Sequence, residues 1–265
     1  MMRPEQRRWF LREPSADARM LLLLMPYSGC GASMYRSWPA AIGDAEVVPL
    51  QLPWRENRMR EPHFGTYQEL AESLLDDVGE LLTARPYALF GHCGGALPAF
   101  ETVIEIARRG LPAPQRYFVS SQVAPQDGPW GRFLGLSEQG LRDEIAGLLH
   151  AMGAAAAADE LVDLFIDVME ADLEANRKYY RPAGSVPCPI TALGWSEDVE
   201  VPHGLMGGWQ EWAATEKLVL PGTHYTFLEA PPALLEALAP RLRTDSASGS
   251  GSGSASGCPE PESAG

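Results

Sequence analysis

The sequence predicts an α/β fold in which a mostly parallel central sheet is flanked by helices. Short apolar runs with the length of strands alternate with longer amphipathic segments with the length of helices. The apolar run at residues 87–90 is followed by the turn Gly-His-Cys-Gly-Gly at residues 91–95 and then by a helical segment at residues 96–109. A strand, a sharp glycine-rich turn and a helix form the setting of a nucleophile elbow, with cysteine where serine is usual.

The first strand is predicted at residues 20–25, because six consecutive apolar residues are typical of a parallel strand buried on both faces. The helix before the elbow strand is expected to begin at a capping box formed by Thr66 and Glu69 and to end before Pro86. The other predicted strands lie at residues 47–50, 87–90, 117–120, 190–193 and 217–220.

A long segment without a strand pattern separates two of these strands. Residues 137–152 and 159–180 have the apolar spacing of amphipathic helices, which fits either a helical lid or ordinary crossover helices. We predict one α/β domain over residues 1–243, with a lid inserted at roughly residues 127–185. Residues 244–265 are rich in Ser, Gly, Pro and Glu, so we expect a disordered tail there, either natural or an engineered linker.

Charge and composition exclude several classes of partner. The net charge of −14 argues against nucleic acid and anionic membranes. The longest apolar run, residues 20–25, is too short to span a bilayer, and the first ten residues lack the apolar core of a signal peptide. The four cysteines show no metal-binding spacing, so we expect no metal, no disulfide framework and a cytoplasmic location.

Cys93 at the elbow is the candidate nucleophile, because the positive end of the following helix favours its thiolate form. The alternative is a buried cysteine in an ordinary glycine-rich turn. A nucleophile of this kind needs a base and an orienting acid. His224 is the predicted base, since it lies in a loop just after the last predicted strand. His92 is adjacent to Cys93 but is expected to point away from it and pack.

Asp198 is the predicted orienting acid, because it follows the strand at residues 190–193 through a glycine-containing turn. Glu197, Glu200 and Asp127 are alternatives that the sequence leaves open. The chain order of nucleophile, acid and histidine is the order found in α/β hydrolases.

Further motifs are spread along nearly the whole chain, in a characteristic order. They are Pro-Tyr-Ser-Gly-Cys-Gly-Ala-Ser at residues 26–33 with Trp38, Leu-Pro-x-Arg-Glu-x-Arg at 52–58 with Glu61 and Pro62, Gly-His-Cys-Gly-Gly at 91–95 with Ala-Phe-Glu at 99–101, Cys-Pro-Ile-Thr-Ala-Leu-Gly at 188–194 with Asp198, and Pro-Gly-x-His at 221–224. In these motifs the chain resembles the stand-alone type II thioesterases of nonribosomal peptide and polyketide synthesis, which belong to the α/β-hydrolase superfamily.

The resemblance implies an α/β-hydrolase fold with a helical lid and no cofactor of its own. The substrate would be an acyl or aminoacyl group held as a thioester on the phosphopantetheine arm of an acyl or peptidyl carrier protein. By position in the motifs, Cys93 would be the nucleophile, His224 the base and Asp198 the orienting acid. The backbone N–H groups of Tyr27 and Gly94 would form the oxyanion hole.

Two residues depart from the family pattern, which usually has Ser at position 93 and often Met at position 94. Transfer of an acyl group from a pantetheine thiol to Cys93 exchanges one thioester for another, so the acyl group stays activated for a second carrier thiol or an amine. Gly94 lacks a side chain beside the acyl site and is expected to widen it. An engineered replacement of Ser by Cys at position 93 would give the same sequence.

Three function classes therefore stay open. The first is thioester hydrolysis or acyl transfer through an acyl-cysteine intermediate. The second is a carrier-to-carrier aminoacyl shuttle or acyltransferase with little hydrolysis, since some such shuttles are similar proteins with an active-site cysteine. The third is an inactive binding protein with the α/β-hydrolase fold.

A cluster of arginines follows the strand at residues 47–50. Arg55, Arg58 and Arg60 are the densest positive group near a strand end, and we expect them to dock an acidic carrier protein. The alternative is that they pair with Glu56 and Glu61 within their own loop. The chain is expected to be a monomer.

Overall fold

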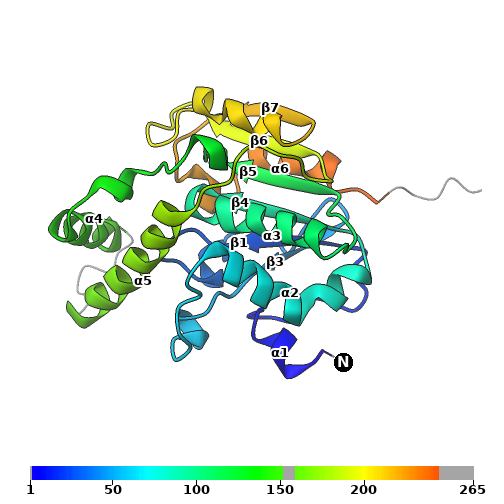
Figure 1. Ribbon diagram of the computed structural model, residues 1–265, viewed down its shortest axis with the longest axis horizontal. Coiled ribbons are helices and arrows are strands. Elements are labelled where there is room, and N and C mark those ends of the chain that lie inside the picture. Colours follow the sequence, from blue (N-terminus) through cyan, green and yellow to red (C-terminus); the bar gives the residue numbers. More distant parts are fainter. Residues whose placement is uncertain (1, 152–158, 245–265) are drawn as a thin grey trace, which may run out of the picture.

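The computed structural model describes residues 2–151 and 159–244, and within them a seven-stranded sheet runs through the centre of the molecule (Figure 1). The strands are β1 (Met20–Met25), β2 (Ala41–Ile42), β3 (Ala45–Pro49), β4 (Tyr87–His92), β5 (Arg116–Ser120), β6 (Ile190–Trp195) and β7 (Thr215–Leu220). Their order is β2-β3-β1-β4-β5-β6-β7, and every pairing is parallel except that of β2 with β3. The predicted α/β class and mostly parallel sheet are confirmed.

The helices are α1 (Pro4–Arg7), α2 (Tyr67–Thr83), α3 (Ala96–Arg108), α4 (Glu138–Ala151), α5 (Asp159–Lys178) and α6 (Pro232–Leu238). Helix α2 begins at the predicted capping box, where Thr66 Oγ1 accepts a hydrogen bond from the Glu69 N–H and the Glu69 carboxylate accepts one from the Thr66 N–H. The short elements α1, β2 and α6 were not predicted from the sequence.

The sheet is covered on both faces, and strand β1 shows why. Its side chains alternate in direction, as in every β-strand. Leu21 and Leu23 belong to the buried cluster that contains the apolar residues of α2 and α3, whereas Leu22 and Leu24 belong to a second buried cluster with Trp38 and the apolar residues of α6. A strand between two helical layers needs apolar side chains on both faces, so its sequence reads as an uninterrupted apolar run.

The segment between β5 and β6 contains α4 and α5, which lie together at one edge of the molecule (Figure 1). Side chains of both helices share a buried cluster with Cys93. The domain boundary at residue 243 and the lid at roughly residues 127–185 stay predictions. The predicted disordered tail lies, apart from Thr244, outside the described residues. None of the helices in the described ranges has the length and apolar character that a bilayer span requires.

Candidate active site

The sheet register brings four loops together at one edge. Met25 at the end of β1 is paired with Gly91 in β4, so Tyr27 and Cys93 each lie two residues beyond a paired position. Trp195 at the end of β6 is likewise paired with Leu220 at the end of β7, and Asp198 and His224 follow these ends closely. Because all four strands are parallel, their carboxyl ends meet at the same edge, where α/β proteins bind ligands.

The turn that carries Cys93 is strained. Cys93 has a φ of 46°, in the left-handed region, and lies at the start of a short 3₁₀ turn that leads into α3. A Cβ atom at Gly91 would lie 2.5 Å from the Gly95 carbonyl oxygen, and one at Gly95 would lie 2.5 Å from the Pro26 carbonyl oxygen. The glycines are therefore required by the close approach of the backbone, as expected for a nucleophile elbow.

Asp198 and His224 are joined by a hydrogen bond of 2.9 Å between Oδ2 and Nδ1. The same carboxylate accepts hydrogen bonds from the Ser121 hydroxyl (2.6 Å) and from the N–H groups of Glu200 and Val201 (both 2.9 Å). Burial alone would raise the pKa of Asp198, but the hydrogen bonds from His224, Ser121 and Val201 lower it below its ordinary value. Asp198 is thus held as an anion and fixes the orientation of the His224 ring.

The second ring nitrogen of His224 lies on the side of Cys93. Burial would lower the pKa of His224, but the hydrogen bond to Asp198 and the proximity of Cys93 raise it to about 10. Nε2 is buried and has no partner in hydrogen-bonding geometry among the described residues. Catalytic hydrogen bonds are often long or misaligned before substrate binds. The site therefore favours a protonated His224 ring beside Cys93.

The other sequence candidates take different places. Glu197 and Asp127 are exposed, and no hydrogen bond or ion pair within the described ranges links either residue to His224. His92 packs as predicted, with Nδ1 2.8 Å from the Ser120 hydroxyl and its ring stacked on Phe227 at 3.7 Å.

Glu200 was an alternative for the orienting acid, but its carboxylate lies at the opposite nitrogen of His224. Its Oε2 is 3.6 Å from Nε2, whereas Asp198 binds Nδ1. Sequence reasoning missed this placement, because two carboxylates two residues apart cannot be assigned to two sides of one ring from their spacing.

The two backbone groups expected to form the oxyanion hole come from neighbouring loops. The N–H of Tyr27 donates to Met34 Sδ at 3.1 Å, and sulfur is a weak acceptor that a substrate oxygen can replace. A Cβ atom at Gly94 would lie 1.9 Å from the Ser28 hydroxyl oxygen, so Ser28 occupies the place where a side chain at position 94 would begin. The widening expected at Gly94 stays a prediction.

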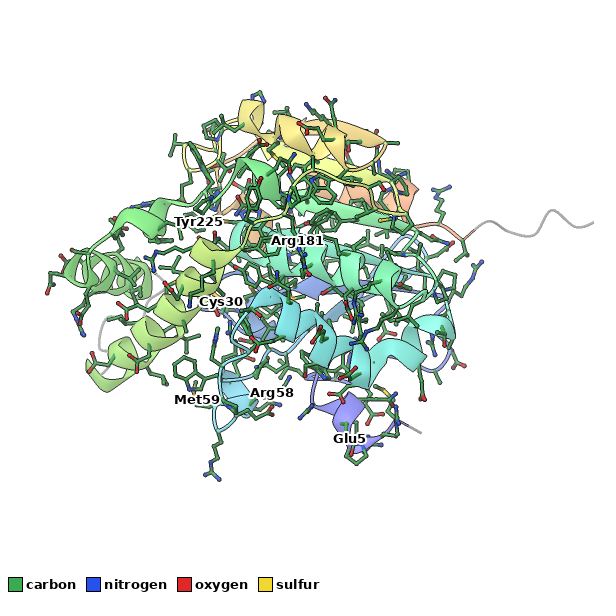
Figure 2. All side chains as sticks on the ribbon, viewed as in Figure 1. Glu5, Cys30, Arg58, Met59, Arg181 and Tyr225 are labelled. Atoms are coloured by element: carbon green, nitrogen blue, oxygen red, sulfur yellow. The ribbon has the colours of Figure 1, made fainter. Side chains whose placement is uncertain are left out.

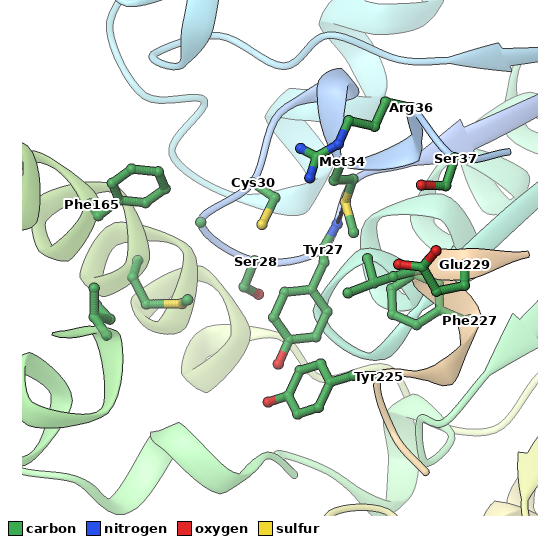
Figure 3. Close-up of a pocket in the computed structure, with 14 residues that line it drawn as sticks. Tyr27, Ser28, Cys30, Met34, Arg36, Ser37, Phe165, Tyr225, Phe227 and Glu229 are labelled. Atoms are coloured by element: carbon green, nitrogen blue, oxygen red, sulfur yellow. Dashed lines mark hydrogen bonds between the residues drawn. The ribbon is translucent and has the colours of Figure 1, made fainter. Parts of the chain in front are cut away.

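A mostly apolar pocket of about 260 Å³ adjoins the site (Figure 3). Its lining includes Tyr27, Met34, Phe165, Met169, Tyr225 and Phe227. Tyr27 and Tyr225 connect the pocket to His224, since their ring centroids lie 6.2 Å and 5.1 Å from that of the histidine. Cys93 is not among the lining residues, so the pocket lies beside it.

The prediction that Arg55, Arg58 and Arg60 dock a carrier protein is wrong for two of the three. Arg55 is 2% exposed and gives two hydrogen bonds of 2.9 Å to the Asp172 carboxylate of α5. Arg58, labelled in Figure 2, is 5% exposed and pairs with the Glu61 carboxylate at 2.6 and 2.8 Å. Buried guanidinium groups with these partners are not available to another protein, so only Arg60 of the three is exposed for docking.

Asp172 is a second residue that sequence reasoning missed. Besides Arg55, its buried carboxylate accepts hydrogen bonds from the Gly29 N–H (2.7 Å) and from His63 Nε2 (2.8 Å). Burial alone would raise the pKa of Asp172, but these partners, Arg55 foremost, lower it to about 2. The contact ties α5 to the loop that carries Tyr27.

No group of three or more His, Cys, Asp or Glu side chains within residues 2–151 and 159–244 is arranged to hold a metal ion.

Comparisons with known proteins identify the family and the fold. The thioesterase domain family matches residues 21–242. The gramicidin S biosynthesis protein GrsT of Aneurinibacillus migulanus is 28% identical over 243 residues, which cover 89% of this chain and 94% of that protein. The thioesterase RedJ from the prodiginine pathway of Streptomyces coelicolor superimposes with a TM-score of 0.74 at 34% identity, covering 88% of this chain and 96% of RedJ. The type II thioesterase BorB from the borrelidin cluster has a TM-score of 0.74 at 28% identity and covers 89% and 98%. The chain therefore belongs to the thioesterase domain family and has the α/β-hydrolase fold of its structural relatives.

Proposed function

We propose that the chain acts on acyl or aminoacyl groups held as thioesters on the phosphopantetheine arm of acyl or peptidyl carrier proteins, in secondary-metabolite biosynthesis. Membership of the thioesterase family supports the reaction class. The biosynthetic roles in the names of GrsT, RedJ and BorB support the carrier-bound substrate. The enzyme needs no cofactor of its own, and we expect it to act as a monomer in the cytoplasm.

One observation carries the mechanism: a cysteine on a strained elbow lies beside a histidine whose other nitrogen is bonded to a buried aspartate. Cys93 passes its proton to His224 Nε2, and the thiolate attacks the carbonyl carbon of the thioester. The N–H groups of Tyr27 and Gly94 stabilise the resulting oxyanion. When the intermediate collapses, the C–S bond to pantetheine breaks, the pantetheine sulfur takes the proton from His224, and the acyl group remains on Cys93.

The second half of the reaction releases the acyl group to water or to another acceptor. Family membership supports hydrolysis. Transfer to a second carrier thiol or an amine is the second candidate, and the cysteine favours it, because an acyl-cysteine has about the same energy as the thioester from which it formed. Cys93 is also buried under residues of α4 and α5, which limits the access of water to the intermediate. We propose that these two helices act as the lid.

The lifetime of acyl-Cys93, measured by intact mass spectrometry after addition of an acyl-carrier protein, tests both steps. We expect the intermediate to form in the wild type and not in Cys93→Ala. A hydrolase loses the acyl group within one turnover, with or without a second holo-carrier. A transferase keeps it until the holo-carrier is added and then discharges it. Absence of any acyl-enzyme in the wild type, with full activity in Cys93→Ala, would refute the proposal.

The Cys93→Ser variant gives the complementary comparison. An acyl-serine is an oxoester, which lies lower in energy than the carrier thioester, so transfer back to a carrier thiol becomes unfavourable. We expect this variant to keep or increase hydrolysis and to lose carrier-to-carrier transfer. An inactive binding protein would show neither reaction in either form.

A further inference from the structure

A second carboxylate lies at the catalytic histidine, on the opposite side of the ring from Asp198. Glu200 Oε2 is 3.6 Å from His224 Nε2, and the Glu200 side chain is only 6% exposed. An orienting acid is needed at one ring nitrogen only, and Asp198 already supplies it at Nδ1. The mechanism above therefore gives no reason for a buried carboxylate at the nitrogen that faces the nucleophile.

The backbone around Glu200 is fixed, whereas its carboxylate is incompletely neutralised. The Glu200 N–H donates to Asp198 Oδ1 at 2.9 Å, and its carbonyl oxygen accepts from Trp130 Nε1 at 3.0 Å. The cation within ion-pair distance of Oε1 is Arg132, at 3.4 Å. Arg132 is 43% exposed at its side chain and lies closer to Glu144, at 2.6 Å. An exposed and shared guanidinium compensates a buried carboxylate only weakly.

Two tyrosines border the same space. The ring centroids of Tyr27 and Tyr225 are 6.4 Å apart, and Figure 3 shows their hydroxyl groups on the same side of the pocket. The Tyr225 hydroxyl is buried and has no partner in hydrogen-bonding geometry among the described residues. Burial and the nearby Glu200 carboxylate raise the pKa of Tyr225, so this hydroxyl stays protonated. A carboxylate beside aromatic rings and a tyrosine hydroxyl group is an arrangement that binds ammonium groups.

The charges at the site also favour a cationic substrate. The carboxylates of Asp198 and Glu200 lie at the two nitrogens of a single ring, that of His224, and the partly exposed Arg132 lies 3.4 Å from Glu200 Oε1. Buried charge without compensation is costly. During the reaction the acyl carbonyl carbon is bonded to Cys93 sulfur, next to His224 Nε2. Because Glu200 Oε2 is 3.6 Å from that nitrogen, a group on the adjacent carbon atom is within reach of this carboxylate.

We propose that Glu200, assisted by the hydroxyl group of Tyr225, binds the ammonium group of an α-aminoacyl thioester, and that the chain therefore selects aminoacyl over desamino acyl groups. This inference rests on the proposed thioester chemistry at Cys93, and it names the substrate class of that same site.

Two thioesters of N-acetylcysteamine test the proposal, one with leucine and one with 4-methylpentanoic acid, which has the same carbon skeleton without the amino group. The ratio of their kcat/KM values, measured by chromatography and corrected for the reaction without enzyme, is the readout. A hydrogen bond between charged groups is worth enough to give a ratio of about 10 to 100 in favour of leucyl in the wild type. In Glu200→Gln the ratio is expected to fall to about 1, because the amide keeps the shape and loses the charge.

Because Glu200 lies beside His224, its loss can change both rates, and the ratio removes that common effect. Tyr225→Phe, which removes one hydroxyl group, should reduce the ratio by about 2- to 10-fold. Glu197→Gln is the matched control: it removes an exposed carboxylate from the same loop and should leave both rates unchanged. A wild-type ratio near 1, with turnover of both thioesters, overturns the proposal and leaves the thioester chemistry intact. A high ratio that survives Glu200→Gln overturns the assignment to Glu200. If neither thioester acylates Cys93, the proposed function itself fails.

Discussion

Replacement of Asp172 by Asn should destabilise the protein more than any surface change on the same helix. The carboxylate accepts hydrogen bonds from the two terminal guanidinium nitrogens of Arg55, from His63 and from the Gly29 N–H, all between 2.7 and 2.9 Å. These hydrogen bonds join α5 to two other segments of the chain, the loop after β1 and the loop before α2. Asn keeps one oxygen but turns an NH₂ group toward these donors, and it leaves the buried Arg55 without a counter-charge.

Two estimates give the loss of unfolding free energy expected for Asp172→Asn. The pKa of Asp172 is lowered from its ordinary value of 3.8 to about 2, which corresponds to roughly 2–3 kcal/mol at about 1.36 kcal/mol for each pKa unit. Removal of one partner from a buried ion pair costs about 3–5 kcal/mol, because the other charge stays buried and unpaired. We therefore expect Asp172→Asn to lose about 3–5 kcal/mol of unfolding free energy and on the order of 10 °C in Tm.

Urea denaturation followed by tryptophan fluorescence measures this loss. The matched control is Glu174→Gln, two residues further along α5, where an exposed carboxylate pairs with Arg177 at 3.5 Å and Lys178 at 3.1 Å. Exposed pairs of this kind contribute at most about 1 kcal/mol. If Asp172→Asn loses no more stability than Glu174→Gln, the buried ion pair does not hold α5 to the domain.

The pH dependence gives an independent check on the same residue. A carboxyl group whose pKa is lower in the folded than in the unfolded state stabilises the fold above the unfolded value. This contribution is complete above about pH 4 and is lost as the pH falls toward about 2. The difference in stability between the wild type and Asp172→Asn should therefore narrow over that range. A difference that stays constant between pH 5 and pH 2 would show that charge is not its cause.

Three further outcomes are expected. A thiol reagent at near-neutral pH should label Cys93 and abolish activity. Cys188 should resist labelling, because burial raises its pKa to about 12. Activity that survives complete labelling of Cys93 would contradict its role as nucleophile. Asp198→Ala should reduce turnover by less than the roughly 10⁴-fold seen in serine triads, because a thiolate–imidazolium pair depends less on its acid. If Asp127→Ala loses more turnover than Asp198→Ala, Asp127 and not Asp198 is the orienting acid. Charge reversal at the exposed Arg60 should raise KM for a carrier-bound thioester by roughly two- to fivefold and leave KM for a small thioester unchanged. An equal loss of activity on both substrates would indicate a damaged fold.

The strands other than the two-residue β2, and the elbow, could be predicted from the sequence because local pattern determines them. The residues of β1 are all apolar because the strand is buried on both faces. The glycines around Cys93 are required because the backbone approaches closely there. Both constraints act within a few residues of the chain. The placement of His224 next to Asp198 could also be predicted, because both residues follow the carboxyl ends of paired parallel strands.

The roles of Asp172 and Arg55 could not be predicted, because their partnership spans 117 positions of the chain. The available signal was indirect: Asp172 lies on the face of α5 that also carries Met169 and Leu173, and both of those residues are buried. An acidic residue on the apolar face of an amphipathic helix requires a buried partner. Sequence alone does not say which of the 21 basic residues provides it.

The two helices that cover Cys93 are held by contacts of very different strength. Helix α5 is joined to the Tyr27 loop through the buried carboxylate of Asp172, and separation there would break the four hydrogen bonds that this carboxylate accepts. The described part of α4 is joined instead through Leu141 and Ile145 and through partly exposed ion pairs such as that of Glu144 with Arg132. Exposed pairs contribute about 1 kcal/mol or less. On the proposed function a carrier arm has to reach Cys93, which is 8% exposed, so part of this cover has to move. Because the described contacts of α4 are the weaker ones, we predict that α4 moves, whereas α5 stays in place and holds the loop that carries Tyr27.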